Sequence, residues 1–318
     1  MNAIQGLHHV TAVARDPQRN VDFYRNVLGQ RLVKRTVNFD SPDTYHFYFA
    51  DETGTPGSVL TFFAWPNMRR GVHGNGETNV VAYNVPVGSL SFWHNHLKQH
   101  DITTDPIETR FGEQVLSFSD PDGMRVELVE VENLPQVQFW AEGPIPETYA
   151  LRGFHSVTLW LDEVDPTAEL LTAQMGYQAA GQEEDRHRFI GDANTIGSIV
   201  DILHRPGKMQ AGFGTGSIHH IAFRVPDDSA QLEYQSAIQA AGFQVTPVMD
   251  RSYFHSIYFR EKGSVLFEIA TNTPGFLIDE PAEALGETLK LPEWLEPNRV
   301  AIEASIAPLK LKTVEKAG

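Results

Sequence analysis

The chain of 318 residues carries 25 lysines and arginines against 41 aspartates and glutamates, and it contains no cysteine. A net charge of -16 disfavours nucleic acids and anionic membranes as partners, because both would repel the protein. Without cysteine, disulfides and thiolate chemistry are excluded. Residues 1–6 do not resemble a signal peptide and no apolar run is long enough to cross a membrane, so we expect a cytoplasmic protein.

In chain order, one pattern of elements recurs four times. Each repeat opens with a short strand, continues through one amphipathic helix and closes with strands joined at a turn that contains glycine. The opening strands are predicted at residues 7–13, 78–84, 154–160 and 218–224. The helices are predicted to begin near Asp16, Ser89, Asp165 and either Asp228 or Ser229, which are residue types suited to a helix N-cap. The repeating unit is therefore βαβββ.

This unit predicts an α+β fold of four βαβββ modules. One module has a half-buried sheet that it cannot cover alone, so modules must pair into curved mixed sheets. We expect a first domain at residues 1–140, from modules one and two, and a second at residues 141–275, from modules three and four. Residues 276–318 leave the repeat and contain several prolines, so we expect a tail packed on the body.

Aligning the modules brings ligand-type residues to two equivalent positions. The opening strands of the first and fourth modules place His9 and His220 at the same position. The closing strand of the fourth module places Glu268 inside an apolar run. Two buried imidazoles and a carboxylate are costly without a partner, and a divalent metal suits two nitrogens and one oxygen. We therefore predict that His9, His220 and Glu268 bind one metal ion.

The residue at the fourth equivalent position indicates which metal this would be. Thr61 is a poor ligand, so the ion would keep open positions. Two histidines and one carboxylate with open positions are typical of non-haem Fe(II) oxygenases, and Mn(II) suits the same donors. Zinc is an alternative, although hydrolytic zinc sites also need a base that activates water. The other two modules offer no imidazole here, and we expect no metal at Val80, Ser156, Glu127 and Asp201.

Ordinary structural roles compete with this interpretation. A single histidine at a strand start usually makes a hydrogen bond, and Glu268 alone could pair with Arg251 or Arg260. The metal is favoured because three ligand-type residues occupy equivalent positions of the repeat. His8 and His219 alternate away from the ligand face in an ideal strand. If strand twist brings them to the rim of the cavity they can act as acid or base, and otherwise they are structural.

Three further residues are candidates for the same cavity. Thr11 follows His9 by two positions and so faces the same side of the strand. Tyr258 shares a face with Glu268 if the hairpin turn has three residues, whereas a two-residue turn puts Ile257 there. Arg251 lies on a preceding segment that is either a lid or an ion-pairing loop.

Several stretches of the chain resemble the vicinal oxygen chelate superfamily, which includes glyoxalases and extradiol dioxygenases. Within it, the chain is most similar to the hydroquinone ring-cleaving dioxygenases. The resemblance runs from Leu7 to about Gly275 and is carried by GLHHVT (6–11), LVKRT (32–36), YHFYFADE (45–52), GTPG (54–57), TRFG (109–112), RGFHS (152–156), HH (219–220) and FE (267–268).

This resemblance implies an Fe(II) ring-cleaving dioxygenase that uses O2 and a hydroquinone or related dihydroxylated aromatic substrate. It implies that His9, His220 and Glu268 hold the iron, and that the groups around it are His8, Thr11, His219, Arg251 and Tyr258. Catechol-cleaving relatives hold their metal within the C-terminal pair of modules. Because Ser156 is not a ligand here, the first module must approach the fourth, within one chain or across a homodimer or higher homo-oligomer.

Two alternative functions belong to other classes. A glyoxalase-like metal-dependent isomerase or lyase needs a fourth protein ligand, and Thr61 argues against it. A non-catalytic protein of the same fold that binds an aromatic compound or a drug would not need a metal triad, and His9, His220 and Glu268 argue against that.

Overall fold

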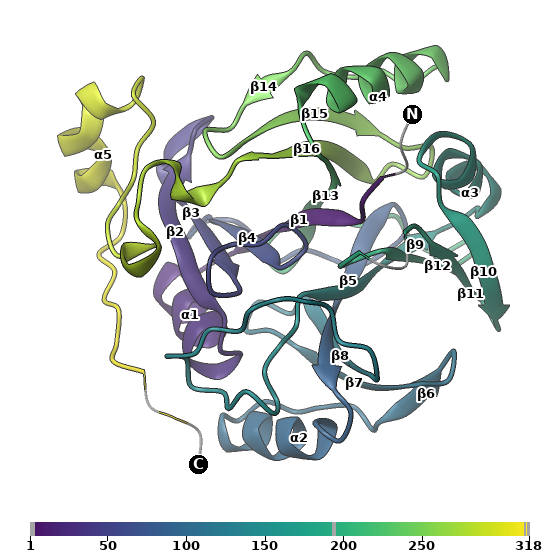
Figure 1. The fold of residues 1–318 in the computed structure, drawn as a ribbon, viewed down its shortest axis with the longest axis horizontal. Helices are drawn as coiled ribbons and strands as arrows, with labels where there is room; N and C mark the ends of the chain where they lie inside the picture. The colour runs from purple at the N-terminus through teal and green to yellow at the C-terminus, as the bar shows by residue number, and fades with distance from the viewer. Residues whose placement is uncertain (1–3, 193–194, 315, 317–318) are drawn as a thin grey trace.

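The protein is described from a computed structural model that covers residues 4–192, 195–314 and 316. Within these residues the strands form two eight-stranded mixed sheets (Figure 1). The first sheet consists of β1 (Leu7–Ala14), β2 (Arg31–Asn38), β3 (Ser41–Ala50), β4 (Val59–Ala64), β13 (Ile218–Val225), β14 (Met249–Asp250), β15 (Phe254–Arg260) and β16 (Leu266–Pro274). The second consists of β5 (Glu77–Pro86), β6 (Glu108–Arg110), β7 (Glu113–Ser119), β8 (Arg125–Val131), β9 (Phe154–Leu161), β10 (Gln178–Glu183), β11 (Arg186–Ile190) and β12 (Ile199–His204).

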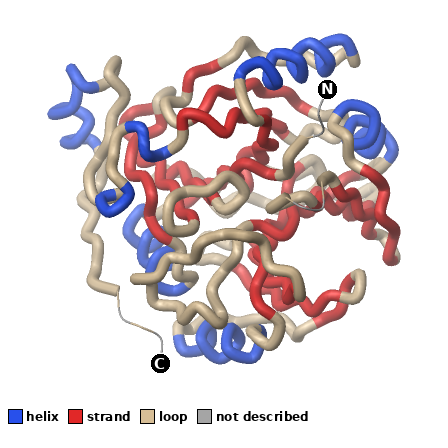
Figure 2. Tube along the Cα trace, in the orientation of Figure 1, coloured by secondary structure: helices blue, strands red, loops and turns tan. Residues whose placement is uncertain are grey.

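The helices are short and lie at the periphery of the view, whereas the strands fill its centre (Figure 2). They are α1 (Pro17–Val21), which continues into the π-helical turn η1 (Asp22–Val27), α2 (Leu90–Gln99), α3 (Asp165–Glu169), which continues into η2 (Leu170–Gln174), α4 (Asp228–Ala240) and α5 (Arg299–Ser305). The carboxylate of Asp16 caps α1, as predicted, and Asp227 rather than Asp228 caps α4. Ser89 makes no capping hydrogen bond to α2, and α3 begins at Asp165 itself, with Val164 at the N-cap position. The predicted βαβββ repeat is confirmed in all four modules.

The two sheets do not follow the predicted division at residue 140. In the first sheet, β1 of module one lies antiparallel to β13 of module four, and in the second, β5 of module two lies antiparallel to β9 of module three. Each sheet therefore takes one module from each expected domain, and the pairing assumed for residues 1–140 and 141–275 is wrong. The same pairing brings the first module beside the fourth within one chain.

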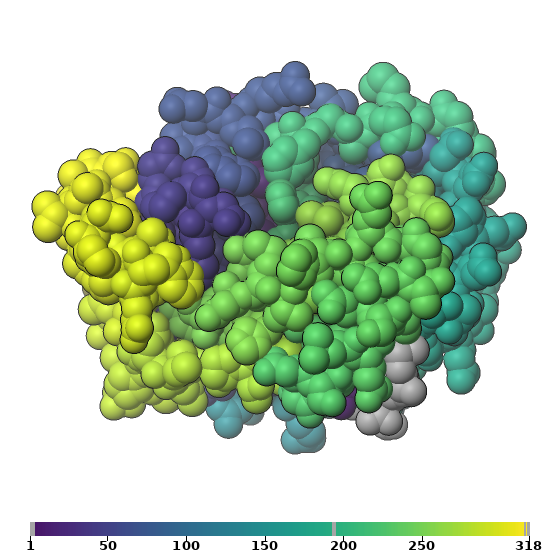
Figure 3. Space-filling model, turned by 90° about the horizontal axis from the view of Figure 1, so that it is seen from above, coloured from purple at the N-terminus to yellow at the C-terminus, as the bar shows by residue number. Residues whose placement is uncertain are grey.

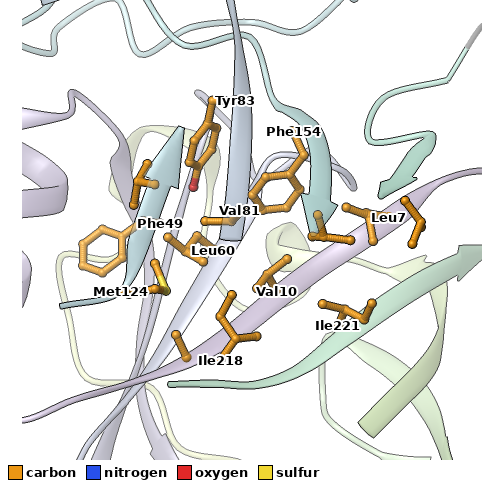
Figure 4. Close-up of a cluster of buried hydrophobic side chains, with 14 of the residues drawn as sticks. Leu7, Val10, Phe49, Leu60, Val81, Tyr83, Met124, Phe154, Ile218 and Ile221 are labelled. Atoms are coloured by element: carbon orange, nitrogen blue, oxygen red, sulfur yellow. The ribbon is translucent and has the colours of Figure 1, made fainter. Parts of the chain in front are cut away.

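The sheets share a hydrophobic core (Figure 4). Leu7 and Val10 of β1 and Ile221 of β13 face Val81 of β5 and Phe154 of β9, and all five side chains are fully buried. Burial of apolar side chains of this size stabilises a fold by about 2 kcal/mol each. The core therefore holds the central strands of both sheets in place, including the strands that carry His9 and His220.

Residues 275–314 run past β2, the edge strand of the first sheet (Figure 1), and the last part of this tail forms the yellow mass at the left of the space-filling view (Figure 3). This tail contains the short 3-10 segments η3 (Phe276–Ile278), η4 (Ala282–Ala284) and η5 (Glu296–Asn298), and then α5. Leu289 forms a β-bridge with Arg35 of β2, and the hydroxyl of Tyr45 on β3 donates to the carbonyl of Ala307 at 2.9 Å. The tail thus covers a sheet edge that would otherwise present unpaired backbone groups.

Within the described residues, no helix is both long and apolar enough to span a membrane. Residues 1–3 of the N-terminal segment, where no signal peptide is predicted, lie outside the described residues. The cytoplasmic location and the homo-oligomer remain predictions.

Candidate metal centre

A β-bulge at each histidine doublet positions the site. In β1 the register with β13 shifts between Leu7 and His9, which leaves His8 as an extra residue, and a second shift leaves His219 as the extra residue of β13. A bulge disrupts the alternation of side chains and re-aims them. The two rings of each doublet accordingly touch: their Nδ1 atoms are 2.9 Å apart in His8–His9 and 2.7 Å apart in His219–His220. The alternation predicted for an unbroken strand is therefore wrong here.

His9, His220 and Glu268 meet on one face of the first sheet, on β1, β13 and β16. The Nε2 atoms of His220 and His9 lie 2.9 and 3.3 Å from Oε2 of Glu268, and 3.3 Å from each other. All three residues are buried. Ligands that each lie about 2.1 Å from one ion are about 3.0–3.4 Å apart, so these separations fit a shared metal. One chain supplies all three groups.

The hydrogen bonds around the three groups leave their lone pairs unused. In each doublet one proton can lie between the Nδ1 atoms, so that His9 and His220 donate through Nδ1 and present Nε2 as an acceptor. Oε1 of Glu268 accepts a hydrogen bond from Ser256 at 2.5 Å, whereas its fully buried Oε2 accepts none. In this tautomer three acceptors converge with no hydrogen between them, and a cation at their centre removes the repulsion among them.

The protonation states agree with this arrangement. Burial lowers the pKa of His220, and burial, reinforced by repulsion from any proton on His220, lowers the pKa of His219 to about 3. Both rings are therefore neutral near pH 7. Burial alone would raise the pKa of Glu268, but the two adjacent imidazoles hold it well below its usual range. The cluster therefore presents the neutral ring of His220 and the carboxylate of Glu268 on either side of a common point, and these are donors that a divalent metal binds.

A cavity of about 330 Å³ opens over this cluster. Its aromatic walls are Phe39, Phe63, Trp65 and Phe254. Its polar lining, apart from His9 and His220, includes Thr11, Asp40, His46, Tyr48, His219, Arg251 and Tyr258. A cavity of this size with aromatic walls and a few convergent polar groups is suited to a small aromatic ligand.

Four of the five residues predicted around the metal line this cavity: Thr11, His219, Arg251 and Tyr258. Tyr258 is paired with Glu268 across the β15–β16 hairpin, so the register that placed Ile257 there does not occur. The predicted place of His8 at the rim is not observed. Its ring is buried against Phe254, with 4.9 Å between ring centroids, and behind His9.

Arg251 links two parts of the cavity wall, Tyr258 of β15 and Asp40. Its Nε donates to the hydroxyl of Tyr258 at 3.2 Å, and its Nη1 lies 3.2 Å from Oδ2 of Asp40, in the turn between β2 and β3. Burial and the nearby charge of Glu268 raise the pKa of Tyr258, so the phenol keeps its proton. The segment that carries Arg251 was predicted to be either a lid or an ion-pairing loop, and the structure contains the ion pair, between Arg251 and Asp40.

The comparison of the four modules did not predict two of the residues that line the cavity, His46 and Tyr48 of β3. Tyr48 contacts His46 through a hydrogen bond of 3.0 Å, and Nε2 of His46 lies 2.9 Å from the hydroxyl of Thr61. Thr61 is fully buried and does not line the cavity. The sequence did contain one signal for them: His46 and Tyr48 are two positions apart on one strand, so their side chains lie on the same face of the sheet.

In the second sheet, arginines occupy the space beside the equivalent carboxylates. Arg188 makes two hydrogen bonds to Asp201, at 2.9 and 3.0 Å, and Arg186 lies 3.2 Å from the same carboxylate. Arg110 lies 2.8 Å from Glu127. These carboxylates therefore already have cationic partners, in contrast to Oε2 of Glu268.

Glu113 of this network predicts a pH dependence of stability. Burial alone would raise its pKa, but hydrogen bonds from His155 and Arg188 lower it to about 2, below its usual value of 4.5. The stabilisation is present above pH 4.5 and is lost as the pH falls toward 2. Urea unfolding should give a difference between wild type and Glu113→Gln that shrinks over this interval. Glu108→Gln, at an exposed ion pair, is the control, and a constant Glu113→Gln difference would contradict the assignment.

The chain is similar in sequence to several named proteins. Residues 6–128 match the family described as the Glyoxalase/Bleomycin resistance protein/Dioxygenase superfamily. The MhqO protein of Bacillus subtilis, whose name describes a ring-cleaving dioxygenase, is 46% identical over 98% of both chains. The chlorohydroquinone/hydroquinone 1,2-dioxygenase of Sphingobium indicum is 36% identical, over 92% of this chain and 93% of its own length.

Solved structures show the same relationship. A crystal structure of a Bacillus subtilis protein described as a dioxygenase has a TM-score of 0.94, with 44% identity over 99% of this chain and 100% of that one. Glyoxalase I from Zea mays has a TM-score of 0.62 at 13% identity, over 84% of this chain and 92% of its own, and shares the fold. The chain belongs to the glyoxalase/bleomycin resistance/dioxygenase superfamily. Within it, this protein is an enzyme of the dioxygenase type, with relatives named as ring-cleaving dioxygenases.

Proposed function

We propose that the protein is an Fe(II)-dependent extradiol-type dioxygenase that cleaves the ring of a hydroquinone or a related dihydroxylated aromatic compound with O2. The observation that carries this proposal is the convergence of two imidazole nitrogens, of His9 and His220, and one carboxylate oxygen, of Glu268, beneath an aromatic-walled cavity. The relative from Sphingobium indicum, which is named for hydroquinone cleavage, supports the substrate class. Mn(II) is the alternative ion for the same donors.

When bound, Fe(II) lowers the pKa of a substrate hydroxyl and holds substrate and O2 together. The protein's own groups orient the ring. His219 accepts from His220 through Nδ1, so its Nε2 carries the hydrogen and can donate within the cavity. Arg251 and the protonated phenol of Tyr258 place positive charge and a donor where negative charge develops on oxygen. His8 acts as a positioning residue, because it accepts the Nδ1 hydrogen of His9.

Isotope labelling of the product tests this function. Protein loaded anaerobically with Fe(II) should consume 18O2 in the presence of unsubstituted hydroquinone and yield a ring-opened product that carries both labelled atoms. The product aldehyde is reduced with borohydride at once, because carbonyl oxygen exchanges with water. Zn(II)-loaded protein is the control and should consume no oxygen. Isomerisation of the substrate without oxygen uptake, or binding without turnover, would contradict the proposal and favour the two alternative functions.

A further inference from the structure

Four polar side chains form a line from the cavity wall to the residue beside His9. The hydroxyl of Tyr48 lies 3.0 Å from Nδ1 of His46, whose Nε2 lies 2.9 Å from the hydroxyl of Thr61. The hydroxyl of Thr61 lies 2.8 Å from that of Thr11. Strand pairing builds this line, because Thr61 of β4 is directly opposite both Tyr48 of β3 and Thr11 of β1.

The direction of these hydrogen bonds follows from the chemistry of each group. Burial, with the nearby imidazoles of His9 and His220, keeps the pKa of His46 well below its usual value, so its ring has one N–H and one acceptor nitrogen. Burial raises the pKa of Tyr48, which remains a phenol. A phenol is more acidic than an aliphatic hydroxyl and is therefore the stronger donor. Tyr48 accordingly donates to Nδ1, and the hydrogen of His46 lies on Nε2.

This direction leaves Thr61 one choice. Its hydroxyl accepts from Nε2 of His46 and has a single hydrogen. Among the described residues, Thr11 is the other partner within hydrogen-bond distance of this hydroxyl, so the hydrogen is donated to Thr11. Thr61 is fully buried, so solvent does not compete for this hydrogen. The hydrogen of Thr11 is then not used by Thr61. Because Thr11 lines the cavity, that hydrogen is available to a bound ligand.

We propose that His46, acting through Thr61, fixes Thr11 as a hydrogen-bond donor to the substrate oxygen beside His9, and thereby favours the ionised hydroxyl over the neutral one. A neutral hydroxyl would itself need an acceptor or a free orientation at this position, whereas an anionic oxygen only accepts. The inference rests on the proposed function, since it concerns the oxygen that the metal would activate. His46 and Thr61 are positioning residues, because neither is proposed to touch the reacting atoms.

The first test reads the tautomer of His46 directly and needs neither metal nor substrate. Nitrogen-15 NMR of the metal-free chain, with the His46 signals identified by their loss in His46→Phe, should show hydrogen on Nε2 and none on Nδ1. Thr61→Val, which removes the acceptor of that hydrogen, should change the Nε2 signal, and Thr61→Ser should leave it near the wild-type value. Hydrogen on Nδ1 in the wild type would overturn the proposal, whatever activity the protein has.

The second test measures ionisation of a bound phenol. In Zn(II)-loaded protein, 4-nitrophenol reports its ionised form by absorption at longer wavelength, and it is not a dihydroxylated substrate. Thr61→Val should raise the apparent pKa of the bound phenol by about one unit, a tenfold change, while Thr61→Ser behaves as the wild type. Zinc content should be equal in all three proteins. Equal titrations of Thr61→Val and the wild type would overturn the proposal. Failure of the proposed function has a different signature, which is the absence of oxygen uptake by the Fe(II)-loaded wild type.

Discussion

Glu268→Gln is expected to weaken Fe(II) binding by more than about 100-fold and to abolish ring cleavage. The amide keeps the size of the side chain and its carbonyl can still accept from Ser256, so the fold should survive. The second oxygen, however, becomes an NH2 group whose hydrogens face the acceptor nitrogens of His9 and His220. These hydrogens satisfy the lone pairs that a metal would use. Equilibrium dialysis of anaerobic Fe(II), with oxygen uptake as the second readout, measures the effect.

The matched control is Glu127→Gln, at the equivalent position of the second sheet. Glu127 pairs with Arg110 and accepts a hydrogen bond from Ser117. Its replacement should leave the iron content and the oxygen uptake of the protein unchanged. Equal loss of iron in the two variants would mean that the acids have been assigned to the wrong sites.

Lys34→Met is expected to destabilise the protein by about 3 kcal/mol. The Lys34 side chain is fully buried, lies over the ring of Tyr253, and its Nζ contacts the carboxylates of Asp279, at 2.6 Å, and Glu280. Methionine fills a similar volume but leaves Glu280, which is only 4% exposed, without its cation. Urea unfolding measures the loss, and proteolysis of the tail after Gly275 should become faster, because this ion pair joins the tail to β2.

Two further variants show whether this effect comes from the buried charge. Lys312→Met removes an exposed ion pair with Asp22, and it should change the free energy of unfolding by less than about 0.5 kcal/mol. Lys34→Met combined with Glu280→Gln should recover part of the lost stability, because no unpaired buried carboxylate remains. A Lys34→Met protein as stable as Lys312→Met would contradict this account of the tail.

The four modules could be predicted because each carries its own local signals: an opening strand, a helix and closing strands around a glycine turn. Their pairing could not be predicted from such signals. Modules one and two would bury the same sheet faces as modules one and four, and nothing local to β1 distinguishes β13 from β5 as its partner. The histidine doublets did contain the relevant information. Once they are recognised as ligands, they require the first and fourth modules to meet.

The metal triad was predictable because its members occupy equivalent positions of the repeat, and the structure places His9, His220 and Glu268 together. The places of their neighbours depended on features that the repeat does not encode. A bulge at each doublet decides where His8 and His219 lie, since one extra residue shifts the alternation of the strand. The contact of His46 with Thr61 joins neighbouring strands, and it becomes visible only once the register of β3 and β4 is known.

The central claim is that one chain holds one metal ion between its first and fourth modules. Anomalous diffraction at the iron edge, from crystals of anaerobically loaded protein, tests it most directly. We predict one peak per chain, about 2.1 Å from Nε2 of His9, Nε2 of His220 and Oε2 of Glu268. A peak beside Glu127 or Asp201, a peak held jointly by two chains, or no peak at the triad would contradict the account.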